Sequence, residues 1–172
     1  MAVYTKIFLK FPYKFWPTGN GTEFFLYAHT RRGYFPIWQH LDTELPGSNI
    51  LFTTVTDEES RRIEKQSDEQ TKAELMVVLK KLFGNKIPEP QTILVPRWFS
   101  NRFYRGSYSN WPNGYTQERY NDLKEPVGPI YFAGEHTNAT YIGYADGAYF
   151  SGITTAKDLI SCLRKSCKGR HI

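Results

Sequence analysis

The segment from Tyr131 to Gly152 holds the residues best suited to chemistry. Its sequence, YFAGEHTNATYIGYADGAYFSG, places the carboxylate of Glu135 after an apolar stretch and before a predicted helix. One face of that helix carries only small residues: Gly143, Ala145, Gly147, Ala148, Ser151 and Gly152. Each glycine costs a helix about 1 kcal/mol relative to alanine, so something must need to approach closely. A helix N-terminus favours an anionic or electron-rich group, but tight packing of the helix on a sheet explains the same residues.

Alternating and helical patterns predict the elements that position this segment. The alternation from Val3 to Phe11 is typical of a strand. Capping-box spacings, Thr56 with Glu59 and Ser67 with Gln70, predict two helices, and a last helix is expected from about residue 143 to 164. Further strands are expected at residues 23–28, 33–39, 50–55, 92–95 and 129–133. The expected fold class is α+β, with an antiparallel mixed sheet and helices.

A long irregular loop is expected over residues 97–120. This stretch has little periodicity but contains eight aromatic residues. A loop so rich in rings must cover another part of the protein or be covered itself.

Composition excludes several classes of protein. Of the 172 residues, 40% are hydrophobic and 16% aromatic, which is typical of a folded chain. No apolar run approaches the ~20 residues that span a bilayer, so no membrane partner is expected. The net charge, 22 − 17 = +5, comes from scattered cations. The nearest to clusters (Lys80 and Lys81, and a tail of Arg164, Lys165, Lys168 and Arg170) are interpreted as helix-end cations, so no nucleic-acid partner is expected.

The two cysteines, Cys162 and Cys167, do not have the spacing of a metal site. They also identify no cellular compartment. No metal is expected.

Several motifs make the chain resemble the flavin amine oxidases, and the extracellular plant polyamine oxidases in particular. Gly-Glu-His-Thr followed by Gly-Tyr and a Gly/Ala-rich helix resembles that family's C-terminal flavin-binding motif. The resemblance runs from about Tyr4 to Cys167 through TKIFLKFPYKFWP, TDEESRRIE, SDEQTKAE, ILVPRW, RGSYSNWP and PVGPIYFAGEHT.

The resemblance implies two domain portions. Residues 1–96 are expected to belong to a substrate-binding domain, and residues 97–172 to form the C-terminal strand–helix portion of a Rossmann-like FAD-binding domain. Family members begin with a βαβ unit whose Gly-rich fingerprint holds the adenine dinucleotide. No G-x-G-x-x-G occurs in this sequence. The chain is therefore expected to be a C-terminal fragment that binds no FAD stably and is inactive alone.

The resemblance also implies an activity. In the intact protein we expect FAD-dependent oxidation of spermine or spermidine at a secondary amine, giving an aminoaldehyde, an amine and H₂O₂. The expected partners are the polyamine and O₂, and the expected state is a monomer. Two alternatives remain open: an oxidase of a different amine, and an inert fragment that acts as an interaction module through its aromatic loop.

Lys6 is the expected catalytic residue. By resemblance it reaches a water near the reactive flavin nitrogen N5, although a lysine alternating on a strand is otherwise a solvated side chain. Tyr4 lies on the same face of the predicted strand, and by resemblance it forms part of the active-site wall. An ordinary cross-strand tyrosine is the alternative for Tyr4.

Aromatic and backbone groups are expected to bind the substrate and the cofactor. By resemblance, Tyr144 and Tyr108 sandwich the amine or its methylene chain, with aromatic packing as the alternative. Glu135 is expected to bind cofactor hydroxyls, with a turn cap as the alternative. By resemblance, the cofactor-binding residues are Trp98, Gly134, Glu135, Gly143, Tyr144 and Ala145, with the backbone N–H groups of Tyr144 and Ala145 facing a flavin carbonyl.

The resemblance implies an extracellular location. The final residues, GRHI, lack a peroxisomal address of the S-K-L type, which favours the extracellular branch of the family. Asn20-Gly21-Thr22 is an N-x-T sequon in a predicted turn, an accessible place for a glycan if the protein is secreted. The first residues, MAVYTKIFLKFP, are not a signal peptide and are predicted to enter a strand at once.

Overall fold

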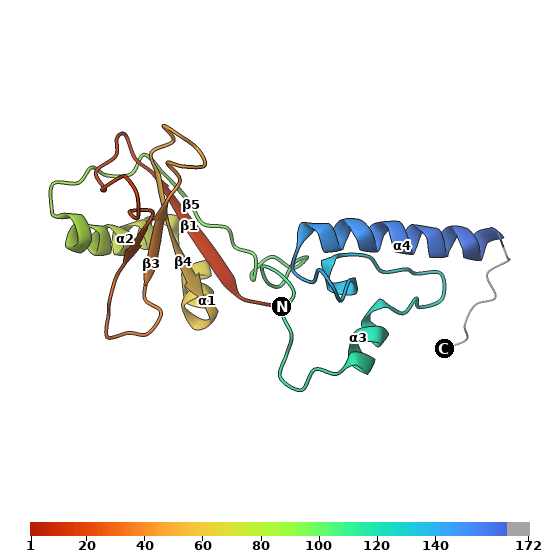
Figure 1. Ribbon diagram of the computed structural model, residues 1–172. Helices are drawn as coiled ribbons and strands as arrows, with labels where there is room; N and C mark the ends of the chain where they lie inside the picture. Colours follow the sequence, from red (N-terminus) through yellow and green to blue (C-terminus); the bar gives the residue numbers. More distant parts are fainter. Residues whose placement is uncertain (165–172) are drawn as a thin grey trace. The chain divides into compact units, whose positions relative to one another are not determined.

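The computed structural model describes residues 1–164 and contains two compact units (Figure 1). The sheet unit comprises residues 2–107, and the helix unit comprises residue 1 and the chain from residue 108 onward. Cys167 and the tail cations at 165, 168 and 170 lie outside the described residues. The assignment of residues 1–96 and 97–172 to two domains stays a prediction.

Five antiparallel strands form the core of the sheet unit, in the order β2-β3-β4-β1-β5. They are β1 (Tyr4–Lys10), β2 (Phe24–Leu26), β3 (Ile37–His40), β4 (Ile50–Thr56) and β5 (Thr92–Leu94). In the β1–β4 register, Lys6 lies opposite Thr54 and Phe8 opposite Phe52. The antiparallel sheet with helices confirms the expected α+β class.

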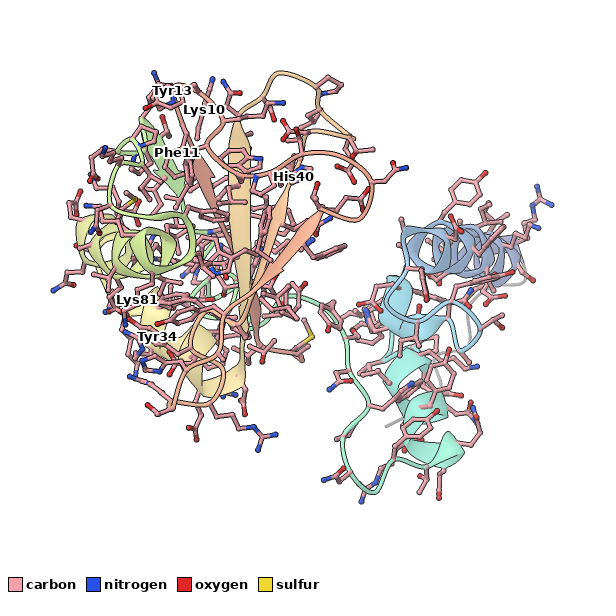
Figure 2. The ribbon with its side chains drawn as sticks, turned by 60° about the vertical axis from the view of Figure 1, so that its left-hand side comes forward. Lys10, Phe11, Tyr13, Tyr34, His40 and Lys81 are labelled. Carbon is pink, nitrogen blue, oxygen red and sulfur yellow. The ribbon has the colours of Figure 1, made fainter. Side chains whose placement is uncertain are left out.

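The alternation of β1 separates a buried face from an outer face. Thr5, Ile7 and Leu9 are fully buried, whereas Tyr4 and Lys6 are half-buried on the opposite face. The two predicted site residues therefore share the outer face of the sheet. Beyond β1, Phe11 is fully buried and Tyr13 is exposed, and both are labelled beside Lys10 in Figure 2.

Two helices complete the sheet unit. They are α1 (Asp57–Glu64) and α2 (Asp68–Phe83). Their apolar residues, among them Ile63, Leu75 and Leu79, share one buried cluster with Ile7, Leu9 and Trp38 of the strands. Burial of this apolar surface is the main stabilisation of the unit.

One of the two predicted capping boxes forms. The Ser67 hydroxyl accepts from the Gln70 N–H, and the Gln70 side chain accepts from the Ser67 N–H, both at 3.1 Å. The capping box predicted at Thr56 is wrong, because the Thr56 side chain makes no cap hydrogen bond. Glu59 instead accepts from Arg62 Nε at 2.9 Å and pairs with Arg31.

The helix unit contains α3 (Gln117–Lys124), a short 3₁₀ helix η1 (Glu135–Thr137) and α4 (Ala145–Arg164). Helix α4 confirms the predicted last helix. Helix α3 lies where a loop was expected until residue 120, and the Thr116 hydroxyl caps it by accepting from the Arg119 N–H at 3.3 Å. The sequence gives this helix no apolar stripe, which is why the helical pattern did not reveal it.

The strand predicted at residues 129–133 is wrong. Among the described residues, this stretch takes part only in an isolated bridge between Val127 and Ile130, and Ile130 and Phe132 are exposed. A strand needs a neighbouring strand to pair its backbone N–H and C=O groups, and no described residues of this unit supply one.

Residues 1–164 contain no helix with the length and apolar character needed to cross a membrane. The same residues contain no group of three or more His, Cys, Asp or Glu side chains that could hold a metal ion.

Candidate functional site

Lys6 lies on the outer face of the sheet against an aromatic pair. Its Nζ is 5.0 Å from the centroid of the Phe52 ring. The Phe52 ring in turn packs against Phe8, with 5.1 Å between centroids. A cation over a ring face gains electrostatic attraction, and the three N–H donors of the ammonium stay available to a water or another acceptor.

An apolar hollow of about 370 Å³ lies on the same face of the sheet. Residues from β1, β4 and β5 line it, among them Phe8, Ile50 and Leu94. Neither Tyr4 nor Lys6 is among the lining residues, so the hollow is separate from the predicted catalytic position.

Trp98 also belongs to the sheet unit. Its side chain is exposed, at 42% of its full accessible surface. The indole meets the Tyr104 ring edge to face at 5.1 Å. An exposed tryptophan of this kind offers a flat apolar surface to a ligand.

Glu135 is held by backbone groups of its own unit. Its Oε1 accepts from the Ser109 N–H at 3.1 Å, and its Oε2 accepts from the Gly143 N–H at 2.8 Å. Burial raises the pKa of Glu135, but a hydrogen bond from the Ser109 side chain, the two backbone hydrogen bonds and the nearby His136 outweigh it, so the pKa lies below its ordinary value. The carboxylate therefore ties together three segments that lead to α4.

Part of the small-residue face of α4 is explained by packing within the unit. A Cβ added to Gly147 would fall 2.2 Å from the Tyr141 carbonyl oxygen. The Ser151 hydroxyl accepts from the Gly134 N–H and donates to the Ala148 carbonyl, both at 2.9 Å. Gly147 and Ser151 thus allow the preceding loop to approach the helix.

Gly143 and Gly152 differ from Gly147, because a Cβ added to either would meet no atom within 4 Å. Gly143 has φ +81°, a conformation that favours glycine. The start of α4 therefore keeps open space beside Gly143.

The two tyrosines expected at the substrate are both exposed, Tyr144 at 68% and Tyr108 at 44%. Both belong to the helix unit. The Tyr144 N–H donates to the Tyr141 carbonyl at 3.1 Å. Of the two backbone amides expected to face a cofactor, that of Tyr144 is therefore engaged within the chain.

A cavity of about 590 Å³ lies in the helix unit. It is bordered by the loop after α3, by η1 and by α4, including Tyr131, Thr137, Thr155 and Asp158. None of the residues predicted to bind the cofactor lines it. The cavity and the predicted cofactor residues are thus different places in the unit.

Sequence reasoning missed two residues, one in each unit, that contact predicted site residues. Ser109 donates to Glu135 from 26 positions away, and Phe52 lies beside Lys6 through strand pairing. No local motif marks either residue, because both contacts depend on the fold.

Comparison with known proteins identifies the family. Residues 1–160 match the family described as flavin containing amine oxidoreductase. The chain belongs to this family. The resemblance inferred from its motifs is thereby confirmed.

Individual members of the amine oxidoreductase family are also similar. The chain is 59% identical to Polyamine oxidase 1 of Zea mays, covering 100% of this chain and 35% of that protein. It is 56% identical to Polyamine oxidase 6 of Oryza sativa subsp. japonica, covering 99% of this chain and 36% of that protein. The chain thus spans about a third of the length of these relatives.

The fold is similar to that of a solved amine oxidase. Cyclohexylamine oxidase from Brevibacterium oxydans superposes with a TM-score of 0.72 at 20% identity, covering 95% of this chain and 36% of that one. At this identity the similarity concerns the fold alone.

Proposed function

We propose that the whole protein is an FAD-dependent polyamine oxidase, where the whole protein means this chain together with the further length that its relatives have. The observation that carries the proposal is 59% identity, over the full chain, to a protein named polyamine oxidase. The proposed substrates are spermine and spermidine. The products are an aminoaldehyde, an amine and H₂O₂.

When bound, FAD would supply the redox chemistry, as an acceptor of the hydride equivalent and the proton that the amine loses and as a donor of the same two electrons and two protons to O₂. The substrate imine left behind takes up one water and splits into the aldehyde and the amine. The residues of this chain are proposed to bind the cofactor and the substrate, to orient a water and to hold protons during these steps.

Lys6 is proposed to orient a water by donating a hydrogen bond from Nζ. Its half-buried position over Phe52 supports this role, because the ring restricts the ammonium without using its donors. A water fixed in this way is a proton donor or acceptor at a defined place.

Tyr4, Tyr108 and Tyr144 are proposed to contact the polyamine. Their rings suit a chain of methylene groups broken by cationic amines, since each cation–π contact contributes about 0.5–2 kcal/mol. The exposure of Tyr108 and Tyr144 supports the proposal, because their rings have surface to offer a ligand.

Gly134, Glu135, Gly143 and Ala145 are proposed to hold the flavin, with Trp98 and Tyr144 against its ring. The residues fit such a group. Each oxygen of Glu135 accepts one backbone N–H and keeps acceptor capacity for a cofactor hydroxyl. The open space at Gly143 and the N-terminus of the 20-residue α4 suit a flat ring bearing carbonyl oxygens.

A substrate comparison tests the proposal. The whole protein is mixed with spermine, spermidine or a monoamine such as benzylamine, and peroxide and aldehyde are measured. Peroxide formed with the polyamines alone is the expected result. Turnover of the monoamine alone supports the alternative of a different amine substrate, and no turnover with a flavin-loaded protein contradicts oxidase activity.

We also propose that the whole protein is extracellular and monomeric, with a glycan on Asn20. The exposure of Asn20 supports the proposed glycan. The side chain lies in a turn that is closed by a hydrogen bond from the Thr22 N–H to the Gly19 carbonyl at 3.2 Å. Protein from plant cell-wall fluid should lose mass on treatment with an N-glycosidase. The Asn20→Gln variant should show no such loss, and sedimentation should give the mass of one chain.

A further inference from the structure

The residues before and after the exposed Trp98 are both held by hydrogen bonds. On the preceding side, the Arg97 guanidinium donates to the Gln66 carbonyl at 3.0 Å and to Asp68 Oδ1 at 2.5 Å. On the following side, Glu64 accepts from residues 99 and 100. A loop residue with an open side chain and a fixed backbone is suited to presenting that side chain to a ligand.

Glu64 accepts the hydrogen bonds that hold residues 99 and 100, which follow Trp98. It is the last residue of α1 and is only 6% exposed. Its Oε1 accepts from the Phe99 N–H at 3.1 Å, and its Oε2 accepts from both the N–H and the hydroxyl of Ser100 at 2.7 Å. Hydrogen bonds to an ionised acceptor are the stronger kind, so this carboxylate fixes the segment firmly.

The same carboxylate is connected to the strand that carries Lys6. Thr5 is fully buried between Tyr4 and Lys6, and its hydroxyl donates to Glu64 Oε1 at 3.4 Å. The Thr5 hydroxyl also lies 2.6 Å from that of Ser60. Glu64 thus links β1 directly to the segment that holds Trp98.

A purely structural role explains these contacts less completely. Burying a carboxylate is costly unless its acceptors are used, and an apolar residue at position 64 would be buried at the end of α1 without that cost. Three of its four described hydrogen bonds go to residues 99 and 100. The carboxylate therefore serves mainly to hold the segment beside Trp98.

We propose that Glu64 is a positioning residue that fixes Trp98 relative to the strand bearing Lys6. The inference rests on the proposed function, in which Trp98 lies against the flavin. Glu64 acts through Trp98 and touches neither substrate nor cofactor.

Hydrogen exchange on the present chain tests the structural half of this inference without a cofactor. In Glu64→Gln, one oxygen becomes an NH₂ group that cannot accept, so one of the two amides, that of Phe99 or that of Ser100, loses its acceptor and should exchange at least about tenfold faster. Glu59→Gln is the matched control: Glu59 is equally buried in α1, at 5% exposure, but pairs with Arg31 and Arg62. It should leave both amides unchanged.

The milder variant Ser100→Ala keeps the carboxylate and removes one donor from an exposed residue. It should speed exchange at Ser100 by a smaller factor, which keeps the test available if Glu64→Gln does not fold. Unchanged exchange at residues 99 and 100 in both variants would overturn the inference, as would an equal change in Glu59→Gln.

A double-mutant cycle on the whole protein tests the functional half. Glu64→Gln should slow anaerobic flavin reduction by spermidine at least about fivefold. The same change in a Trp98→Phe background should add little, because Glu64 acts through Trp98. Equal effects in both backgrounds would contradict the inference. Absence of flavin reduction in the wild type would count against the proposed function instead, and the hydrogen-exchange result would then decide the structural half of the inference alone.

Discussion

The ammonium of Lys6 lies 5.0 Å from the centroid of the Phe52 ring, on the face of β1 that points away from the core. Phe52 is on β4, opposite Phe8 and diagonal to Lys6 in the antiparallel register. Strand pairing therefore sets the position of the one side chain proposed to handle protons. A lysine held in this way keeps its charge near the sheet and its donors free for a water.

Replacing Lys6 by Met should slow the whole protein. Met has a similar length but no hydrogen-bond donor, so the water would lose its orientation. We expect the rate of flavin reduction or of its reoxidation by O₂ to fall about 10²-fold or more, measured by stopped-flow absorbance. Lys10→Met is the control, because Lys10 lies on the same strand face but in no proposed role, and its rates should stay near those of the wild type. Equal rates in Lys6→Met and wild type would remove Lys6 from the reaction.

Gly147 and Gly152 should respond oppositely to alanine. The new methyl group at 147 would fall 2.2 Å from Tyr141 O, whereas at 152 it meets open space. Gly147→Ala should lower the free energy of unfolding of the helix unit by about 1–3 kcal/mol, and Gly152→Ala should raise it by about 0.5–1 kcal/mol. Urea titration followed by hydrogen exchange in α4 measures both. A stabilising Gly147→Ala would show that the loop does not press on the helix there.

Glu135 should make the helix unit sensitive to acid. Its folded pKa lies below the ordinary 4.5, because hydrogen bonds from Ser109 and Gly143 outweigh the raising effect of burial. A lowered pKa contributes stability that is fully present above 4.5 and is lost as the pH falls through the folded value. The stability difference between wild type and Glu135→Gln should therefore be largest near neutrality and shrink below about pH 4.5. A difference that stays constant from neutral to acidic pH would contradict this assignment.

Arg62 should contribute more to stability than its neighbour Arg61. Arg62 donates to both oxygens of Glu74 at 2.8 Å and to Glu59 at 2.9 Å, and the hydrogen bonds to Glu74 raise its pKa. Arg62→Lys loses the bidentate pairing with Glu74 and should lower the free energy of unfolding of the sheet unit by about 1–3 kcal/mol. Arg61 pairs with the exposed Asp57, so Arg61→Lys should cost under about 1 kcal/mol. Thermal unfolding compares the two, and equal losses would mean that the Glu74 pair is no stronger than a surface ion pair.

Local sequence patterns predicted the structural features whose interacting residues lie close together in the sequence. The alternation at residues 3–11 gave β1, because a strand with one buried face must repeat every second residue. The spacing of Ser67 and Gln70 gave a true capping box, since both partners lie in one turn. The same spacing at Thr56 failed because Arg31 and Arg62 occupy Glu59.

Contacts between distant residues were not predictable in this way. Glu64 and Ser100 form a hydrogen bond although they are 36 positions apart in the sequence, and Glu135 and Ser109 do so at 26 positions apart. Neither spacing is typical of a known motif. The apolar run at 129–133 favours a strand by its composition, yet pairing rather than composition decides whether a strand forms. For the site residues, the sequence predicted which side chains share a face of β1, while their roles rest on the family.

The most direct test of the proposed activity is anaerobic mixing of the whole, flavin-loaded protein with spermidine. The account predicts that the absorbance of oxidised flavin disappears and that admission of O₂ restores it with release of about one H₂O₂ per flavin. A flavin spectrum that stays unchanged with both spermidine and spermine would contradict the account.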